Sequence, residues 1–484
     1  MRSNYTASET AGLQVLSDDQ CAWLLASAIE ILERTGAVYH DEESLEILKK
    51  AGCYPDGSRV RIPGKLVEKA VSTAPSTVAL SNSRNGVRVM ELGSGNVYFG
   101  TGSDTPYCID PHTDTRIPTS KKSVSMAAKV IDALPNLDFV MSLGIVLDVP
   151  QLVYDRHQFE TMVLNTSKPI VITAIDNEGY GDIIEMCEIV AGGEEELRKH
   201  PFMTLYAEPI SPLTHPRESA QKLVLAGKKQ LPVVYTPCIM AGSTVPATIA
   251  GAVAQGLAES LSGLVLNQQT REGNPFIMGG VFTIMDMATT IFSYGAPEFD
   301  LMMAALADMS LYLQIPLFGT AGCSDSKLTD EQTAIEYAIS IMMSAQSGAN
   351  LTHDVGYIEH GNTSSLDALV VANDLIGYAK RFVKGIEVNE ETLALDVIDK
   401  VGPGGNFLTE KHTLRHFKTE TWYPPLFQRT VYENWVADGQ KTLTNRAHDK
   451  LMDILDHYEP EPLSNDVQQK LREVVERAEQ KIVK

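Results

Sequence analysis

The sequence predicts an α/β protein built around a (β/α)8 TIM barrel, with helical extensions at both ends. Three observations predict this fold. Short apolar runs of strand length alternate with longer helical patterns, eight such runs fall within roughly 260 residues, and both flanking regions have helical patterns. Short apolar strands that alternate with helices are typical of a parallel sheet with helices outside it. A doubly wound open sheet is the competing architecture, because periodicity does not reveal closure.

Residues 1–95 are predicted to form an N-terminal helical segment with small β elements. Ser17 is placed to cap a helix whose first turn is acidic, and Gly36 ends that helix. Pro63 can occupy the first turn of a second helix. From Thr77 to Tyr107 the pattern becomes strand-like, with Gly and Asn turns between the strands.

Residues 96–376 are predicted to form the barrel, and residues 377–484 a C-terminal helical extension packed on it. The extension is helical and charged, and it ends in a Lys- and Glu-rich helix. The eight barrel strands are expected at Val97–Gly100, Asp138–Leu147, Pro169–Ala174, Phe202–Ala207, Pro232–Tyr235, Pro275–Gly280, Ile315–Gly319 and Asn350–His353.

Polar and aromatic residues follow several of these strands at the same end. The clearest cases are Gln314–Asp330 and Ala349–Ser364, where an apolar run leads directly into a Gly-rich polar loop. Active sites of TIM barrels lie at the carboxyl ends of the strands. The candidate site residues are Tyr98, Asp104, Tyr107, Glu208, Phe282, Gly319, Cys323, His353, Asp354 and Tyr357.

Each candidate also has a purely structural interpretation. His353 can be a hydrogen-bonded core histidine, Cys323 a small buried hydrophobe, and Asp325 a cap for the following helix. The aromatic residues can fill the top of the barrel, or they can surround a quaternary ammonium group. Their recurrence at one end of successive units favours a site.

Composition excludes several classes of function. A formal charge of −22 argues against nucleic acid as a partner, since nucleic-acid binding needs a basic surface. The chain has no uncharged apolar run long enough to cross a bilayer, and its start lacks an apolar signal core. Six widely spaced cysteines without a CxxC pair indicate reduced thiols. We therefore expect a cytoplasmic protein with no membrane partner.

Metal and nucleotide sites have little support in the sequence. His412 and His416 stand at i, i+4, a spacing that can bind zinc, but no third ligand accompanies them and they lie outside the barrel units. We interpret them as part of a partly exposed basic helix turn. The Gly-rich stretches at Gly93 and Gly402 match no dinucleotide or P-loop signature, and GxSxG is absent.

Long motifs nevertheless identify a family. The stretches FGTAGCSDSKLTDEQTAIE, HDVGYIEHGNTSSLDALVVANDLIG and HTLRHFKTETWYPPLFQRTVYENWVADG resemble the trimethylamine methyltransferase family, and the match extends over nearly the whole chain. The resemblance implies a TIM barrel. It also implies transfer of a methyl group from a methylated amine to the Co(I) centre of a cognate corrinoid protein. No cofactor is then tightly bound, because the cobalamin belongs to the partner.

The resemblance also bears on the substrate. Founding members of the family carry an in-frame pyrrolysine proposed to activate trimethylamine, and this chain has none; the loop Thr320–Lys327 is where its counterpart is expected. The chain is most similar to the non-pyrrolysine branch that includes glycine betaine:corrinoid protein methyltransferase. Glycine betaine is therefore the expected substrate. Proline betaine, carnitine and γ-butyrobetaine are alternatives, as are a non-catalytic amine-binding barrel and a barrel lyase or isomerase.

A quaternary ammonium needs no proton transfer, because a neutral tertiary amine leaves. The site must then orient the substrate and exclude water. Tyr98, Tyr107, Phe282 and Tyr357 are candidates for an ammonium cage, with Asp104 or Glu208 as counter-charge. His353, or backbone N–H groups of Gly319–Cys323, are candidates for the betaine carboxylate. The apolar segment Trp422–Phe427 can dock the partner or a second subunit of the expected homo-oligomer, or pack on the barrel.

Overall fold

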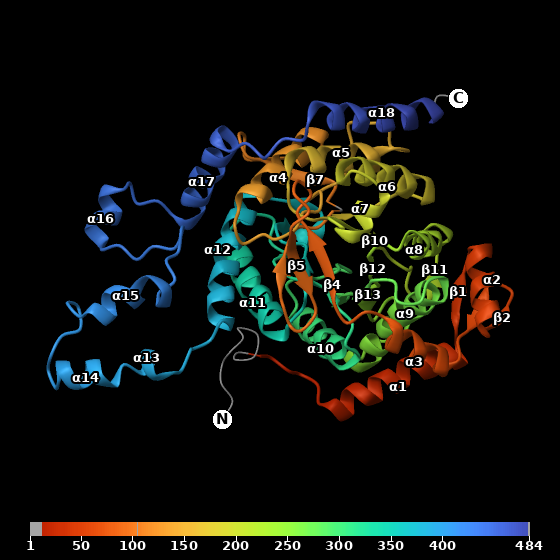
Figure 1. The fold of residues 1–484 in the computed structure, drawn as a ribbon, viewed down its shortest axis with the longest axis horizontal. Coiled ribbons are helices and arrows are strands. Elements are labelled where there is room, and N and C mark those ends of the chain that lie inside the picture. The colour runs from red at the N-terminus through yellow and green to blue at the C-terminus, as the bar shows by residue number, and fades with distance from the viewer. Residues whose placement is uncertain (1–11, 104, 483–484) are drawn as a thin grey trace.

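Seven strands form a curved, entirely parallel sheet at the centre of the molecule. The computed structural model describes residues 12–103 and 105–482, and Figure 1 shows its fold. The strand order is β6-β17-β16-β14-β12-β10-β9. These strands are β6 (Tyr98–Phe99), β9 (Ile170–Ile172), β10 (Met203–Ala207), β12 (Val233–Tyr235), β14 (Phe276–Gly279), β16 (Leu317–Thr320) and β17 (Leu351–His353). Each falls at a predicted strand position, so the expected mixed α/β architecture is confirmed.

The eighth predicted strand, Asp138–Leu147, is much shorter than expected. Phe139 forms a single parallel bridge with Gly100, just after β6, and Val140 forms one with Ile170 of β9. Beyond this point Met141 pairs with a side chain: the Thr101 hydroxyl donates to the Met141 carbonyl at 2.7 Å and accepts from its N–H at 3.0 Å. Because Met141 pairs with a side chain and not with a neighbouring backbone, the ladder of backbone hydrogen bonds ends here. The predicted strand is therefore wrong beyond Val140.

Helices cover the outside of the sheet and join its strands (Figure 1). They are α4 (Lys121–Ala133), α5 (Tyr154–Asn165), α6 (Asn177–Ala191), α7 (Glu194–Lys199), α8 (Arg217–Lys229), α9 (Ile249–Thr270), α10 (Pro297–Leu313), α11 (Glu331–Ser347) and α12 (Leu366–Val383). Helix α9 is long and apolar enough to cross a membrane, but 78% of its apolar window is buried inside the protein. It is a core helix of this fold.

The N-terminal segment forms a small layer against α9. It contains α1 (Asp18–Arg34), β1 (Ala37–Tyr39), α2 (Glu42–Ala51), β2 (Tyr54–Asp56), β3 (Arg59–Arg61) and α3 (Gly64–Thr73), and its sheet has the order β11-β1-β3-β2 with β11 (Thr214–His215). Ser17 caps α1 as predicted, accepting from the Gln20 N–H at 3.3 Å. Pro63 lies one residue before α3, at its N-cap.

A β-hairpin covers the interior of the sheet at the amino ends of its strands. It consists of β4 (Val78–Ser81) and β5 (Arg88–Leu92). Ser81 N–H donates to the carbonyl of Pro201, two residues before β10 begins, at 2.8 Å. Leu80, Met90 and Leu92 of the hairpin belong to one buried cluster with Tyr206 and Phe318 of the sheet. The amino side of the sheet interior is therefore filled with apolar side chains.

Two smaller sheets lie at the carboxyl ends of the central strands. One has the order β18-β19-β7-β8, with β18 (Tyr357–Ile358), β19 (Thr363–Ser364), β7 (Tyr107–Asp110) and β8 (Thr115–Pro118). The other pairs β13 (Cys238–Ala241) with β15 (Val281–Ile284) in parallel. Together they surround the end of the sheet where the site was predicted.

The C-terminal region has a packed part and a projecting part. Helix α12 runs across the predicted boundary at residue 376; α17 (Leu443–His457) packs on α12 and α4, and α18 (Asn465–Ile482) on α5 and α6. Residues 386–421, which we term the arm, project from this body at the left of Figure 1. The arm holds α13 (Glu390–Leu393), α14 (Leu395–Val401) and α15 (Lys411–Glu420), and none of its residues is buried. Helix α16 (Tyr432–Ala437) follows it.

The apolar segment Trp422–Phe427 returns the chain from the arm to the body. The Trp422 ring lies 5.7 Å from the Tyr378 ring of α12, and Leu426 is buried. The N–H groups of Leu426 and Phe427 donate to Asp374 of α12 at 2.9 and 3.3 Å. Within one chain, this segment therefore packs on the barrel helices.

Candidate functional site

His353 ends strand β17 and is buried at the carboxyl side of the sheet. Its Nδ1 lies 2.7 Å from the carbonyl oxygen of Gly319 on the neighbouring strand β16. A carbonyl only accepts, so Nδ1 carries the proton and donates. The other ring nitrogen, Nε2, lies 3.4 Å from the Asp354 carboxylate. The fold therefore gives His353 a fixed orientation at the carboxyl side of the sheet, with Asp354 beside it.

Asp354 follows directly and is also buried, with a left-handed backbone (φ +69°). The Tyr294 hydroxyl donates to its Oδ2 at 3.0 Å. Burial raises the pKa of Asp354 from 3.8 to about 7, while the Tyr294 hydrogen bond lowers it by less. Near neutral pH this carboxyl group is therefore present in both forms, and a neighbouring cation shifts it to the charged form.

Gly102 lies where Asp354 and Tyr357 approach the backbone. A Cβ built on Gly102 would overlap Asp354 Oδ1 and the Tyr357 hydroxyl. Only glycine allows the Asp354 carboxylate and the Tyr357 hydroxyl to come this close to the backbone. Gly102 therefore belongs to the candidate site, although the sequence offered no signal for it. The predicted residue Asp104, two positions further on, lies outside the described residues.

Asp325 does not cap a helix; it holds the loop that carries Tyr294. Its carboxylate accepts from Ser293 Oγ at 2.5 Å, from the Tyr294 N–H at 2.9 Å and from the Gly295 N–H at 3.1 Å. The cap of α11 is Asp330. Asp325 thus positions Tyr294, and through it Asp354.

Cys323 is fully buried beside Tyr357, with which it forms a single backbone bridge. Burial, with smaller effects from nearby carboxylates, raises the pKa of its thiol well above the usual value. The thiol is therefore uncharged and unsuited to nucleophilic attack. The backbone N–H groups of Ala321 and Gly322 in the same loop already donate, to the His353 carbonyl and to Ser340.

Two aromatic rings lie beside His353, and the hydroxyl of one of them binds a carboxylate. The Phe318 and Tyr206 ring centroids lie 4.0 and 6.4 Å from that of His353. The Tyr206 hydroxyl donates to Glu208, an exposed residue, at 2.9 Å. Tyr206 could have been found from the sequence, because residues two apart on a strand share a face and Glu208 was already a candidate. Phe318 and Tyr294 were not predicted.

Three predicted residues lie apart from this group. The Tyr98 hydroxyl accepts from the Glu91 N–H of the β4–β5 hairpin at 3.1 Å, at the opposite end of the sheet interior. The buried Phe282 ring packs at Gly256 of helix α9. Tyr107 lies in the sheet with β18, but the Arg116 guanidinium lies 3.6 Å from its ring centroid. A face occupied by arginine is not available to an ammonium ligand.

Lys222 is a buried lysine that the sequence did not place at this end of the sheet. It comes from helix α8, and its ammonium donates to the carbonyl of Ala174, just after β9. Burial lowers the pKa of Lys222, and the carboxylates of Asp155 and Glu208 oppose this effect. Lys327, at the end of the loop Thr320–Lys327, is exposed. A mid-helix lysine gives no local signal that its long side chain reaches a neighbouring strand end.

The chain matches the sequence model of the trimethylamine methyltransferase (MTTB) family over residues 2–483. A trimethylamine methyltransferase of Desulfitobacterium hafniense is 33% identical over 473 residues, which cover 97% of this chain and 95% of that protein. A glycine betaine methyltransferase from another strain of that species is 28% identical over 462 residues, with 95% of each chain covered. The solved monomethylamine methyltransferase of Methanosarcina barkeri aligns with a TM-score of 0.49 and 13% identity, covering 93% of this chain and 96% of that one.

Proposed function

Because the chain belongs to the trimethylamine methyltransferase family, we propose that it moves a methyl group from glycine betaine to the Co(I) centre of a corrinoid on a separate cytoplasmic protein. The products are dimethylglycine and methyl-Co(III). The observation that carries the choice of a quaternary amine is the loop Thr320–Lys327, which contains only ordinary residues. A neutral amine needs a group that activates it, whereas a quaternary amine already has a neutral leaving group.

The reaction balances without a proton. The cobalt electron pair forms a bond to the methyl carbon, the C–N bond breaks, and its electron pair stays on nitrogen; cobalt is oxidised formally from Co(I) to Co(III). The protein contributes orientation and exclusion of water. In our assignment His353 is hydrogen-bonded to the betaine carboxylate. The ammonium lies near Asp354 and Glu208, against the rings of Tyr206 and Phe318.

We further propose that the central sheet is a (β/α)8 barrel in which residues 138–141 occupy the eighth position. The bridges of Phe139 to Gly100 and of Val140 to Ile170 support this interpretation, because they join the two edge strands of the seven-stranded sheet. A closed barrel has one mouth at the carboxyl ends of its strands. The corrinoid protein would then present its cobalt to this mouth.

The proposal is tested by mixing the protein with reduced cobalamin and, separately, glycine betaine, proline betaine, carnitine, γ-butyrobetaine and trimethylamine. We expect the visible spectrum of Co(I) to convert to that of methyl-Co(III) with glycine betaine. Conversion with another quaternary amine alone would change the substrate but keep the chemistry. No conversion with any amine would reject the methyltransferase proposal.

Replacing His353 by alanine is expected to raise the glycine betaine concentration for half-maximal rate by about 10- to 100-fold. A hydrogen bond to a charged group contributes about 1.5–3 kcal/mol, which corresponds to this change. Initial rates of methyl-Co(III) formation over a range of betaine concentrations measure the effect.

His215→Ala is the matched control. His215 of β11 is also a buried histidine, hydrogen-bonded to Tyr235 of β12 and to Ser262 of α9. Its loss removes the same volume from a core, and so it should lower stability without changing the betaine requirement. Equal betaine requirements for both variants would remove His353 from the site.

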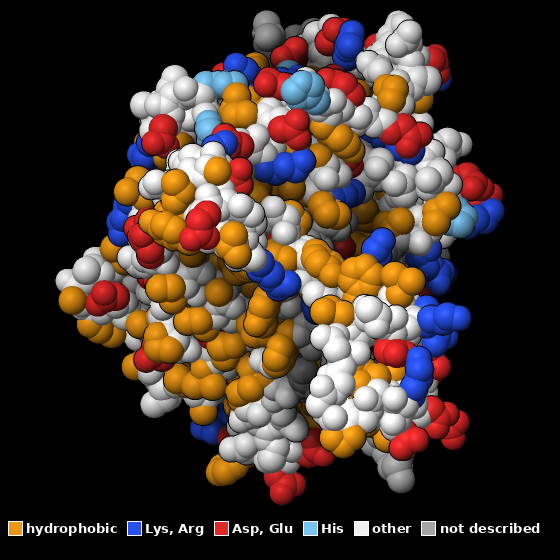
Figure 2. Space-filling view, turned by 90° about the vertical axis from the view of Figure 1, so that its left-hand side faces the viewer, with side chains coloured by type: hydrophobic (Ala, Val, Ile, Leu, Met, Phe, Trp, Pro, Cys, Tyr) orange, Lys and Arg blue, Asp and Glu red, His pale blue; other side chains and the backbone are white. Residues whose placement is uncertain are grey.

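We also propose that the protein is a homo-oligomer in which a second copy covers the arm. Figure 2 looks onto the side from which the arm projects and shows hydrophobic side chains gathered there. On the arm, Leu395, Leu408 and Leu414 are 67%, 81% and 72% exposed. With a formal charge of −22, apolar surface is where two copies can meet without bringing acidic groups together.

The double variant Leu408→Asp, Leu414→Asp is expected to shift the protein from an oligomer to a monomer in light scattering coupled to size exclusion. Both side chains are exposed in one chain, so the monomer loses little packing. Val87→Asp is the control, since Val87 is 58% exposed on the hairpin at another part of the surface. A wild-type protein that is monomeric at micromolar concentration would contradict the proposal.

A further inference from the structure

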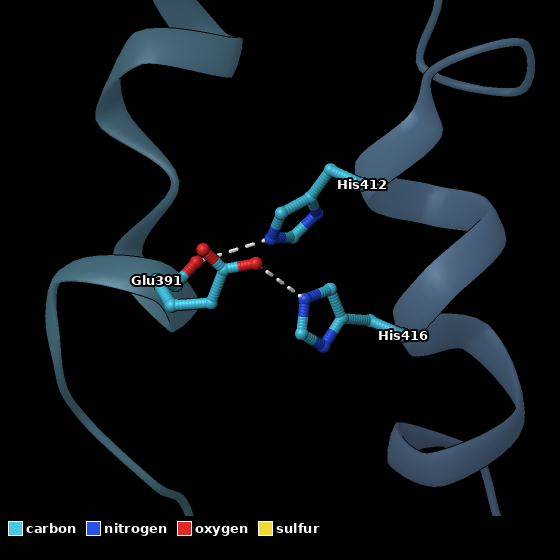
Figure 3. A group of neighbouring side chains, drawn as sticks. All are labelled: Glu391, His412 and His416. Carbon is cyan, nitrogen blue, oxygen red and sulfur yellow. Dashed lines mark hydrogen bonds and ion pairs between the residues drawn. The ribbon is translucent and has the colours of Figure 1, made fainter.

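Three side chains of metal-binding type converge in the arm. Glu391 comes from α13, and His412 and His416 come from successive turns of α15. Figure 3 shows their polar ends turned toward one another. One ligand atom from each can be chosen so that all three lie within 4.8 Å of one another. Within residues 12–103 and 105–482, this is the one group of three such residues that meets that spacing.

The contacts in this group already join the two helices. His416 Nε2 lies 3.0 Å from Glu391 Oε1, and His412 Nε2 lies 3.1 Å from the Glu391 backbone oxygen. The two imidazole rings lie 4.3 Å apart between centroids, as i, i+4 neighbours on one helix face. The sequence pattern contained only the histidine pair; the carboxylate that completes the set is 21 residues before His412 and is brought in by the fold.

We propose that Glu391, His412 and His416 bind a zinc-class divalent cation that clips α13 to α15. Zinc takes imidazole nitrogen at about 2.0–2.1 Å and carboxylate oxygen at about 2.0–2.2 Å, so tetrahedral ligands are about 3.4 Å apart. His416 Nε2 and Glu391 Oε1, 3.0 Å apart, are already near this spacing, and the group as a whole, within 4.8 Å, reaches it by side-chain rotation. Two imidazoles favour zinc, nickel or copper over magnesium or calcium. Three protein ligands leave the fourth position for water.

The arm lacks a buried core that would hold its helices together, which a bound cation would replace. None of its residues 386–421 is buried, so burial of apolar surface within one chain contributes little to holding α13 against α15. Metal coordination supplies this stability in small units that lack a core. Arg415 Nη1 now lies 3.4 Å from Glu391 Oε1, but its side chain is 64% exposed and can turn into solvent when a cation binds.

Zinc binding is measured by titrating zinc sulfate into full-length, chelator-treated protein in a calorimeter. We expect wild type to bind one zinc equivalent that is lost in His412→Ala, His416→Ala and Glu391→Gln. His457→Ala is the matched control, because exposed His457 pairs with Asp453 at 3.2 Å but has no second histidine. It should bind zinc like wild type.

A second measurement tests the clip itself. Zinc should slow proteolytic cleavage within residues 386–421 of wild type and of His457→Ala, and should have no effect in the three ligand variants. Because the ligands are partly exposed and outside the core, these variants are expected to fold. Equal zinc binding by wild type and His412→Ala, or no protection of the wild-type arm by zinc, would overturn the proposal.

Discussion

Replacing Gly102 by alanine is expected to reduce the rate of methyl transfer by about 100-fold while the protein stays folded. The added methyl group overlaps the ends of the Asp354 and Tyr357 side chains, which must rotate away because they are the movable partners. A displacement of about 1 Å in an orienting group can cost about 100-fold in rate. The initial rate of methyl-Co(III) formation measures the effect, and circular dichroism checks the fold.

Gly181→Ala is the matched control for this change. Gly181 lies on the exposed face of α6, and a Cβ there meets nothing within 4 Å. Alanine should stabilise the helix by about 1 kcal/mol and leave the rate unchanged. A Gly102→Ala enzyme with the wild-type rate would show that Asp354 and Tyr357 do not orient the substrate.

Asp354→Asn is expected to stabilise the protein at pH 8 while weakening betaine binding. The pKa of Asp354 is about 7 in the folded protein and about 3.8 in the unfolded chain. Below pH 4 both states hold the proton; between pH 4 and 7 only the folded state does. The free energy of unfolding of wild type therefore falls as pH rises through this interval and stays lower above pH 7. At 1.36 kcal/mol per tenfold change in acidity, the loss is up to about 4 kcal/mol.

Urea unfolding of wild type and Asp354→Asn at pH 5 and pH 8 measures this difference. The variant should lose less stability between the two pH values than wild type. The free energy of unfolding of the variant should still depend on pH in part, because burial and the charge of Glu336 also raise the pKa of Asp300 to about 7. The exposed Asp56→Asn is the control and should behave as wild type. Equal pH dependence in Asp354→Asn and wild type would contradict a buried, destabilising carboxylate.

The fold was predictable where short apolar runs carry the information. Seven strands form at predicted positions, because short apolar runs between helices can bury both faces only inside a covered parallel sheet. The exception is instructive: Asp138–Leu147 is apolar enough for a strand, yet its pairing beyond Val140 depends on the Thr101 hydroxyl. When a side chain takes the place of a backbone hydrogen-bond partner, the periodicity of the sequence does not show it. The exposed arm was not predicted either, since helical pattern alone does not reveal whether a helix finds a surface to cover.

Which candidate residues lie near a strand end was predictable from the sequence, but the direction of their side chains was not. His353, Asp354 and Tyr357 follow one strand and come together with Gly319 of the next. Tyr98 and Phe282 also lie near strand ends. Tyr98, however, binds the β4–β5 hairpin at the amino ends of the strands, and Phe282 faces helix α9. Tyr294 was missed because its position is set by Asp325, a long-range contact with no local pattern.

The β4–β5 hairpin has a kinetic consequence. With the amino side of the sheet interior filled, betaine and cobalt would share one opening in the proposed reaction. In that reaction betaine would bind first, the corrinoid protein would dock over it, and dimethylglycine would be held beneath the docked partner after methyl transfer. Turnover of the proposed enzyme would then follow a compulsory order, with product release limited by the lifetime of the docked complex.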